Sequence, residues 1–437
     1  MLQKSQWESY FEFAALGATW RQEILAGLTT FVTMAYIIFV NPSILAEAGM
    51  PHAAVAIATC LGAGFGSLLM GFWARYPIAL APGMGLNAYF TYVVVKGLGV
   101  PWEVALGAVF LSGVAFLLLT LTGLRQRIVE ALPPELYAAV AVGIGLFIAF
   151  IGLKNAGIVV ADGATTVTLG NLRAPSTALA CAGLLVTAAL LAWGFQGAML
   201  LGILLTTIGG IALGLVQWQW TKPDLRALSG TAFQLDIPRA LEFGLLEIVF
   251  VFLFVDLFDN LGTLVAVSKK AGLIDESHKI PRVGRILMAD SLATMFGGLM
   301  GTSTVVSYIE SAAGVAAGGR TGVTAIVTGL LFLAAAFVAP VFGIIPVAAT
   351  APALILVGSF MIAHAAEIPW HDTEVAIPAF LTIIAIPLTF SIANGLAFGF
   401  VAYTLLKLLR GKGAQVGWLV YVLTALFLAR FIYLGKG

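Results

Sequence analysis

The feature that most constrains this sequence is a succession of apolar runs, each about long enough to cross a lipid bilayer as a helix. A membrane-spanning helix needs roughly 20 apolar residues. Seven such runs precede a polar stretch at residues 217–240, and seven more follow it. The runs lie near residues 24–43, 53–73, 78–95, 103–122, 133–153, 176–194, 197–216, 244–267, 284–300, 303–318, 322–343, 346–364, 375–391 and 393–409. The sequence therefore predicts an all-α polytopic membrane protein with about 14 transmembrane segments.

The composition supports this class and excludes several others. Of the 437 residues, 60% are hydrophobic and only 10% are charged, whereas about 25% of the residues in a typical soluble domain are charged. The 22 Lys and Arg residues barely outnumber the 21 Asp and Glu residues, so there is no basic surplus for binding nucleic acid. The two cysteines, Cys60 and Cys181, lie inside apolar runs, which argues against a disulfide scaffold.

The sequence contains no pattern typical of a metal, cofactor or ATP site. The four histidines lack metal-ligand spacing, and neither a Walker A motif nor a dinucleotide fingerprint occurs. We therefore expect no metal, no cofactor and no enzyme activity. Residues 1–22 are polar and rich in aromatic residues, so we expect residues 1–23 to be a cytoplasmic segment rather than a cleavable signal peptide.

The order of the runs predicts an inverted repeat, because two consecutive halves of seven spans enter the membrane from opposite sides. Loops on the side of the N-terminus hold Arg75, Arg125, Arg127, Lys269, Lys270, Lys279, Arg282, Arg285, Arg320, Lys407, Arg410 and Lys412. Loops on the other side hold Lys96, Lys154, Arg173 and the mixed-charge segment 217–240. By the positive-inside rule, both termini are expected in the cytoplasm, with the chain in the plasma or inner membrane and segment 217–240 outside the cytoplasm.

One further apolar segment, residues 417–435, does not fit this count. Arg430 lies well inside it, and an arginine in the middle of a bilayer costs at least about 2.5 kcal/mol. We therefore expect residues 413–437 to be interfacial or packed on the bundle. A fifteenth span is the alternative.

The third and tenth runs carry residues that interrupt a transmembrane helix. The third contains Pro82, Gly83 and Gly85, so we expect extended backbone over residues 78–82 and a helix from about Gly85. The tenth begins with β-branched and hydroxyl residues and continues with small, helix-compatible ones. Each of the two runs is the third of its half, as an inverted repeat requires.

These matched interruptions predict a cavity near the middle of the membrane. Extended backbone survives at that depth only where protein or a cavity satisfies its polar groups. Two half-helices that begin there aim free N–H groups and the positive ends of their dipoles into the cavity. Ser307 and Glu310 have the spacing of a capping box at the start of the second half-helix. The alternative is that the prolines and glycines serve packing only.

Acidic residues inside the spans are the strongest candidates for a functional site, because ionisable groups are costly in a membrane. On a helix, Asp256, Asp259, Asn260 and Thr263 fall within an arc of roughly 100° and so form one polar stripe. Glu310 supplies a third acid from the tenth run. Carboxyl groups that share a cavity titrate as a coupled set, which suits proton-coupled transport.

Three of the polar residues also have a structural explanation. Asp256 could form an interhelical hydrogen bond or salt bridge that only fixes packing. Asp290, near the basic loop that precedes the ninth run, is interpreted as a structural or loop-pairing residue. Asn87, just inside the half-helix of the third run, is either a cap or a ligand contact, and we favour the contact.

Four stretches of the sequence resemble the AzgA-like purine permeases, which belong to the nucleobase/cation symporter-2 group together with the xanthine and uracil permeases. They are residues 23–36 (EILAGLTTFVTMAY), 81–90 (APGMGLNAYF), 255–264 (VDLFDNLGTL) and 307–315 (SYIESAAGV). The likeness extends over about residues 17–435. It implies proton-coupled symport of adenine, guanine and hypoxanthine across the cell membrane by alternating access.

The resemblance also implies a division of the spans into two domains. The core domain would consist of residues 24–122 and 241–343, and the gate domain of residues 127–216 and 344–412. In such permeases the core moves relative to the gate during transport.

By motif position, the resemblance assigns binding of the base to Asn87, Asp259 and Glu310. It assigns proton coupling to Asp256, Asp259 and Glu310. Thr263 stands where members of the wider group often have a histidine, one turn after the binding acid. We include Thr263 among the binding residues. Because threonine does not titrate as histidine does, the carboxyl groups must then carry the coupled protons.

Two rival functions are weaker. A xanthine, uracil or inorganic-anion carrier of the same architecture is the alternative, although three acids in one cavity would repel anions. An intramembrane aspartyl protease needs its two acids on facing helices, whereas Asp256 and Asp259 share one helix. The expected partners are therefore a purine base, protons and the lipid bilayer. The preferred purine, the carboxyl group that carries the proton and the formation of a homodimer are left open.

Overall fold

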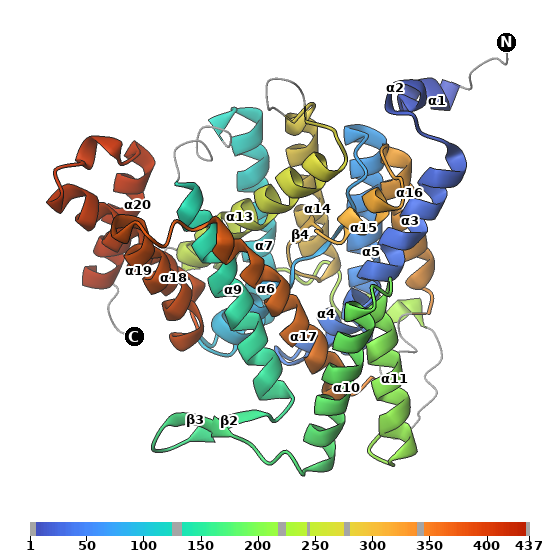
Figure 1. The fold of residues 1–437 in the computed structure, drawn as a ribbon, viewed down its shortest axis with the longest axis horizontal. Helices are drawn as coiled ribbons and strands as arrows, with labels where there is room; N and C mark the ends of the chain where they lie inside the picture. The colour runs from blue at the N-terminus through green and yellow to red at the C-terminus, as the bar shows by residue number, and fades with distance from the viewer. Residues whose placement is uncertain are drawn as a thin grey trace. The chain divides into compact units, whose positions relative to one another are not determined.

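The computed structural model describes residues 6–124, 133–216, 224–242, 245–274, 280–338 and 345–433, without the side chains of Phe258, Asp259, Leu261, Arg430 and Tyr433. These residues are mostly helical (Figure 1). They divide into two compact units. The first unit consists of Met1–Leu118 and Lys154–Ala353, and the second of Leu119–Leu153 and Leu354–Gly437. Each unit is described by itself, and the division into core and gate domains stays a prediction.

The first unit holds most of the helices and the four described strands. Its N-terminal part contains α1 (Gln6–Tyr10), α2 (Phe13–Leu16), α3 (Trp20–Met34), α4 (Ile37–Ala46), α5 (His52–Leu69), η1 (Met70–Ala74), β1 (Leu80–Pro82), α6 (Met84–Ala88), η2 (Tyr89–Val95) and most of α7 (Trp102–Leu121). Its later part contains β2 (Val159–Asp162), β3 (Thr166–Leu169), α10 (Pro175–Ala192), α11 (Ala198–Ala212), η3 (Leu225–Gly230), α12 (Ile237–Ala240), α13 (Leu246–Lys270), α14 (Val283–Met300), β4 (Val305–Ser307), α15 (Ser311–Ala316) and α16 (Gly322–Ala335).

The second unit is helical throughout its described residues. It contains most of α9 (Pro134–Asn155) and of α17 (Val347–Met361), together with η6 (Ile362–Glu367), α18 (Thr373–Leu388), α19 (Ile392–Leu409), η7 (Gly413–Gln415) and α20 (Trp418–Tyr433). The C-terminal apolar segment forms α20, which packs along α19. The Thr404 and Thr424 hydroxyl oxygens lie 2.8 Å apart, and the Phe400 and Phe427 rings are stacked. Whether α20 crosses the membrane stays a prediction.

Each of the predicted apolar runs contains helix. Among the described residues, eight helical stretches are long and apolar enough to span a membrane, and further apolar helices are shorter. One break was not predicted: in the first run α3 ends at Met34 and α4 begins at Ile37, with Ala35 and Tyr36 between them. The hairpin of β2 and β3 between α9 and α10 was not predicted either.

The two interrupted runs meet as a pair of short antiparallel strands. Strand β1 pairs with β4 in the register Leu80 to Ser307, Ala81 to Val306 and Pro82 to Val305. Each strand leads into a half-helix, α6 after β1 and α15 after β4. The expected extended backbone before a helix in the third run, and in the first half of the tenth, is confirmed. The pairing extends one residue beyond β1, since the Gly83 N–H donates to the Thr304 carbonyl oxygen at 3.0 Å before α6 begins at Met84.

Neighbouring helices satisfy the backbone of these strands, as the low polarity of a membrane interior requires. The Ser67 hydroxyl on α5 bonds both polar groups of Leu80, at 2.9 Å from the nitrogen and 3.2 Å from the oxygen. The Thr294 hydroxyl on α14 donates to the carbonyl oxygen of Val305 at 3.1 Å. Gly66 lets α5 approach, since a Cβ there would lie 3.1 Å from the Cβ of Leu80 and 2.9 Å from that of Ala293.

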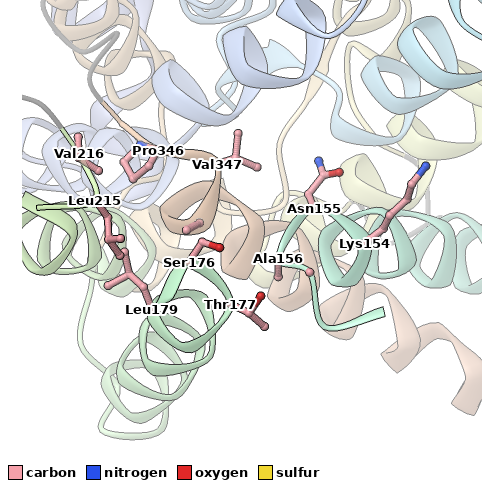
Figure 2. Close-up of a pocket in the computed structure, with 12 residues that line it drawn as sticks. Lys154, Asn155, Ala156, Ser176, Thr177, Leu179, Leu215, Val216, Pro346 and Val347 are labelled. Carbon is pink, nitrogen blue, oxygen red and sulfur yellow. The ribbon is translucent and has the colours of Figure 1, made fainter. Parts of the chain in front are cut away.

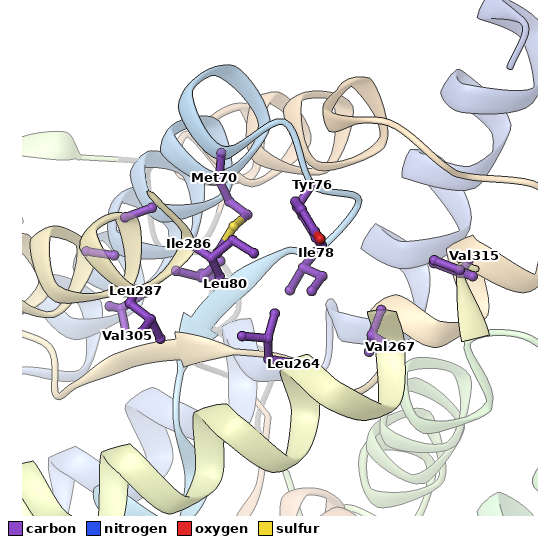
Figure 3. Packing of buried hydrophobic residues seen from close by; sticks show 14 residues of the cluster. Met70, Tyr76, Ile78, Leu80, Leu264, Val267, Ile286, Leu287, Val305 and Val315 are labelled. Atoms are coloured by element: carbon purple, nitrogen blue, oxygen red, sulfur yellow. The ribbon is translucent and has the colours of Figure 1, made fainter. Parts of the chain in front are cut away.

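A cluster of buried apolar side chains surrounds the strand pair and fixes its place in the first unit. Figure 3 shows Leu80 and Val305 from the two strands packed with Ile286 and Leu287 from α14 and with Leu264 from α13. Within a membrane, close van der Waals packing of such side chains, and not their removal from water, stabilises the contact. The strand pair is therefore held from several sides.

The expected capping box at the start of the second half-helix is wrong. Ser307 lies in β4, and its hydroxyl has no hydrogen-bond partner among the described residues. Glu310 occupies the N-cap position of α15, but its side chain makes no cap hydrogen bond. The physical reason is that Glu310 bonds a tyrosine of the first run instead, as described below.

Candidate functional site

The candidate site is built around Glu310, at the point where the tenth run changes from strand to helix. The Glu310 side chain is partly exposed, and Oε1 accepts a hydrogen bond of 2.6 Å from the hydroxyl of Tyr36. Tyr36 is 1% exposed and lies in the break between α3 and α4. A buried tyrosine thus orients a carboxyl group that still has one oxygen available to a ligand.

Asn87 lies on the first half-helix, α6, and connects the two interrupted runs. Its side chain is fully buried, and its Oδ1 accepts a short hydrogen bond from the Ser303 hydroxyl. The Tyr308 hydroxyl donates to the carbonyl oxygen of Pro82 at 2.5 Å, which links the runs a second time. Among the residues that the structure describes, the Asn87 amide nitrogen contacts only the sulfur of Met84, at 3.9 Å. The Asn87 amide is therefore oriented by the hydrogen bond to its oxygen, and its N–H groups can donate to a ligand.

Helix α13 carries the predicted polar stripe and packs against α6, β4 and α15. Asp256 and Asn260 are fully buried, and Thr263 is 8% exposed. Leu264, one turn after Asn260, belongs to the apolar cluster around β1 and β4. Asp256 and Asn260 lie on the same face of α13 as Leu264. That face is turned toward the strand pair.

The side chain of Asp259 lies outside the described residues. The predicted meeting of Asp256, Asp259 and Glu310 in one cavity is therefore untested and stays a prediction. Asp290, interpreted as structural, is fully buried on α14.

Buried polar atoms without partners gather around the strand pair. Neither polar atom of the Asn260 amide has a hydrogen-bond partner among the described residues. The same holds for the hydroxyl groups of Thr304 and Ser307, which flank and end β4. Such groups are rare in folded proteins, because each one loses its hydration without a replacement. A polar ligand beside β4 would supply partners to the Asn260 amide and to whichever of the two hydroxyl groups faces it, because residues three apart on an extended chain point to opposite faces.

Several residues of this site were not assigned a role from the sequence. Tyr36, Ser303 and Thr304 are in this group. A tyrosine inside an apolar run gives no signal of its own, since the partner of Tyr36 is more than 270 positions away. Within the described residues, no group of three or more His, Cys, Asp or Glu side chains could hold a metal ion.

Comparison with solved structures gives the fold. The transmembrane domain of the cyanobacterial bicarbonate transporter BicA superimposes with a TM-score of 0.64 at 18% identity, over 87% of this chain and 97% of that one. The overall structure of SLC26A9 gives a TM-score of 0.65 at 10% identity, over 92% of this chain and 67% of that one. The chain has the seven-plus-seven inverted-repeat fold of these transporters, as the sequence predicted.

Comparison with known sequences gives the family. A permease of Methanocaldococcus jannaschii is 53% identical over 430 residues, which is 98% of each chain. The guanine/hypoxanthine permease PbuG of Bacillus subtilis is 46% identical over 98% of this chain and all of its own. The adenine permease AdeP of Escherichia coli is 42% identical over 98% of this chain and 96% of its own. The model of the xanthine/uracil permeases, described as a permease family, matches residues 21–398. The chain therefore belongs to the xanthine/uracil permease family and is a membrane transporter, not an enzyme.

Proposed function

We propose that this chain is a secondary active transporter that carries purine nucleobases into the cell together with protons, by alternating access. The substrates would be adenine, guanine and hypoxanthine. The names of the relatives support the class of substrate, since they include permeases for adenine and for guanine and hypoxanthine. We place the chain in the plasma or inner membrane with both termini in the cytoplasm.

The observation that carries the proposal is the position of Glu310. It stands at the start of a half-helix inside the membrane, oriented by Tyr36 and partly exposed. A purine is flat and nearly neutral, and its edge presents both N–H donors and lone-pair acceptors. The carboxylate can accept hydrogen bonds from the N–H groups of the purine. The Asn87 amide nitrogen and the Thr263 hydroxyl can donate hydrogen bonds to its acceptor atoms.

Specificity follows from the buried polar atoms beside β4. A base whose edge matches them would satisfy the amide of Asn260 and the hydroxyl group, of Thr304 or of Ser307, that faces the base. A mismatched base would leave some of them buried without partners, at a cost of about 1–3 kcal/mol each. This difference is enough to separate purines that carry an amino group from those that carry a carbonyl at the same position.

Proton coupling is assigned to Asp256, Asp259 and Glu310. Protonation of Asp256 or Asp259 would reduce the negative charge near Glu310 and favour binding of a neutral base. The loaded core spans would then move relative to the gate spans. For coupling, the proton must leave on the cytoplasmic side before the empty carrier returns, because a carrier that returned with its proton would move no net proton with the base.

The substitution Glu310→Gln tests the binding role. It keeps the shape of the side chain but turns one accepting oxygen into a donor, so we expect saturable uptake of labelled hypoxanthine to be abolished. Uptake is measured in cells that lack their own purine carriers, with the amount of protein in the membrane determined in parallel.

Glu367→Gln serves as the matched control for this experiment. Glu367 lies on η6 in the second unit, and its side chain is 65% exposed and pairs with His364. Uptake by this variant should equal that of the unchanged protein. Near-normal uptake by Glu310→Gln would defeat the assignment, and competition by adenine, guanine, xanthine and uracil would define the preferred base.

The substitution Asp259→Asn tests proton coupling. The amide of asparagine neither gains nor loses a proton near neutral pH. Substrate-driven movement of protons should therefore be weakened, even if the variant still binds the base. In proteoliposomes, addition of hypoxanthine outside should raise the external pH with the unchanged protein and raise it less with the variant. Equal alkalinisation per base transported would show that Asp259 carries no proton.

A further inference from the structure

A cavity of the first unit lies apart from the strand pair, where several chain segments end. Its volume is about 310 Å³, within the lower range of small-molecule sites. The first residues of α10 and of α17 line it together with the chain that follows α9 and α11 (Figure 2). Small side chains pack beside it, among them Ala156, Ala180 and Ala351.

Two helix N-termini open into this cavity. Ser176 and Thr177 belong to the first turn of α10, and Val347 and Ala348 to the first turn of α17. The first N–H groups of a helix have no partner within it, and the helix dipole places partial positive charge there. α10 has 18 residues and α17 has 15, so both dipoles are fully developed. Such ends bind phosphate and other anions.

The hydroxyl group of Thr177 provides an independent sign of a ligand. Thr177 is only 5% exposed, lines the cavity and makes no side-chain hydrogen bond within the described part of the chain. Figure 2 shows its hydroxyl and that of Ser176 between the start of α10 and Ala156. Gly157 leaves room there, since a Cβ at that position would lie 2.7 Å from the Thr177 oxygen. The hydroxyl group therefore lies at the cavity wall, where it can donate a hydrogen bond to an acceptor in the cavity.

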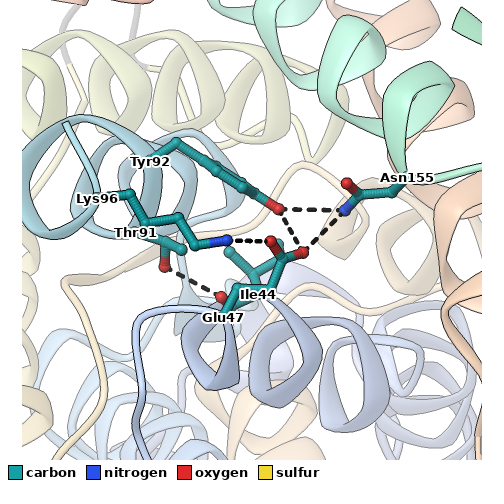
Figure 4. Close-up of polar contacts among 6 residues, drawn as sticks. All are labelled: Ile44, Glu47, Thr91, Tyr92, Lys96 and Asn155. Carbon is teal, nitrogen blue, oxygen red and sulfur yellow. Dashed lines mark hydrogen bonds and ion pairs between the residues drawn. The ribbon is translucent and has the colours of Figure 1, made fainter. Parts of the chain in front are cut away.

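The charges around the cavity favour an anion. Lys154 lies at its edge with an exposed side chain. The neighbouring Asn155 also lines the cavity, and its amide nitrogen lies 3.1 Å from an oxygen of Glu47 and 3.1 Å from the hydroxyl oxygen of Tyr92 (Figure 4). Glu47 does not leave an unbalanced negative charge, because the Lys96 ammonium lies 2.6 Å from its other oxygen.

The remaining wall of the cavity is apolar. It is formed by Leu179, Leu215, Val216, Pro346 and Val347. Leu215 is 42% exposed and Val347 is 47% exposed. The apolar surface continues along α11, where Leu213 and Ile208 are more than 60% exposed. A ligand with an anionic group and an apolar part therefore matches this surface better than a polar anion with no apolar part.

We propose that this cavity binds a phosphate-type oxyanion between the N-termini of α10 and α17, with the Thr177 hydroxyl as a donor. Two sources supply this chemistry, the headgroup of an anionic phospholipid and free inorganic phosphate. The oxyanion ties α10 to α17, two helices that begin far apart in the sequence. No purine takes part, so this site is separate from the transport site.

The test compares the unchanged protein with three variants. Thr177→Val removes the hydroxyl at constant shape, and Lys154→Gln removes the nearby charge from an exposed position. Thr207→Val is the matched control, because Thr207 on α11 is 7% exposed and its hydroxyl donates to its own helix at 2.8 Å. One arm titrates delipidated protein with inorganic phosphate at constant ionic strength and follows the thermal midpoint. The other arm uses native mass spectrometry with phosphatidylglycerol and with a diacylglycerol of the same acyl chains.

Binding in either arm should weaken about tenfold in Thr177→Val, as expected for loss of one hydrogen bond to an anion, and about two- to threefold in Lys154→Gln. Thr207→Val should bind like the unchanged protein. A saturable rise of the midpoint with phosphate identifies the free anion as a ligand, and retention of phosphatidylglycerol alone identifies the lipid. Equal binding by Thr177→Val and Thr207→Val, equal retention of the uncharged diacylglycerol, or no binding in both arms would overturn the proposal.

Discussion

At the scale of single residues, the site depends on side chains that pair across the whole length of the chain. Tyr36 and Glu310 are joined by one hydrogen bond, and Asn87 and Ser303 by another. Each pair links a break in the first half of the chain to the tenth run. Because the partners of these groups are so distant in sequence, only the folded chain creates the arrangement that a ligand meets.

The substitution Tyr36→Phe tests the role of the tyrosine at this scale. Loss of the hydroxyl leaves Oε1 of Glu310 without its donor and frees the carboxyl group to turn away. A hydrogen bond to a charged group contributes about 1.5–3 kcal/mol, so we expect the KM for hypoxanthine to rise about tenfold or more while the amount of protein is unchanged.

Tyr421→Phe is the control for this prediction. The Tyr421 hydroxyl also donates one hydrogen bond, to the Gly413 carbonyl oxygen at 3.0 Å, but in the second unit. Its loss should leave the KM unchanged. If Tyr36→Phe and Tyr421→Phe behave alike, the tyrosine does not position Glu310 for binding.

At the scale of elements, a buried carboxylate fixes the start of α16 and so the packing of α3 against it. Glu23 is fully buried, and its Oε1 accepts from the Arg320 and Thr321 N–H groups at 2.8 and 3.1 Å. Its Oε2 accepts from the Thr324 hydroxyl at 2.6 Å. A carboxylate at a helix N-terminus satisfies free N–H groups and complements the dipole.

The substitution Glu23→Ala should therefore destabilise the first unit. It removes the cap and leaves buried N–H groups without partners, so we expect the free energy of unfolding to fall by about 2 kcal/mol. The thermal midpoint of the purified protein measures this loss. Glu8→Ala is the control, because Glu8 is exposed and bonds the Trp20 indole at 3.1 Å. Equal midpoints for the two variants would contradict the capping role.

At the scale of the whole molecule, the two interrupted runs are third in their halves and meet as antiparallel strands. The antiparallel pairing is what two halves of opposite orientation produce when equivalent segments meet. The inverted repeat therefore explains both the strand pair and the placement of the half-helices on either side of it. The orientation of the whole chain in the membrane follows from the loop charges and is open to test.

Reporter fusions test that orientation. Green fluorescent protein fused before Met1 should fluoresce, and alkaline phosphatase inserted at Gly163, in the hairpin between α9 and α10, should be active outside the cytoplasm. Alkaline phosphatase fused after Gly437 should be inactive. Activity of that last fusion, with the N-terminal reporter still fluorescent, would show that α20 is a fifteenth span.

The sequence by itself determined the class of protein, the number of apolar runs and the positions of the two interrupted helices, because these features depend on local composition. A bilayer imposes about 20 apolar residues on a span, and proline and glycine act on the backbone where they stand. The buried stripe on α13 was also predictable for Asp256, Asn260 and Thr263, since helix periodicity alone decides which residues share a face. The hairpin of β2 and β3 was missed, although the alternation of polar and apolar residues in Thr166–Leu169 is a weak local signal.

Only the tertiary structure decided how the polar groups pair. The spacing of Ser307 and Glu310 predicted a local cap, but a strand occupies the first position and Tyr36 binds the second. The hydrogen bond that a local motif predicts competes with bonds to groups far away in the sequence. Long-range packing determines which of these partners the side chain can reach. The environments of Glu23 and Thr177 could not be predicted for the same reason. Each is formed by helices that are distant in the sequence and that meet only in the folded chain.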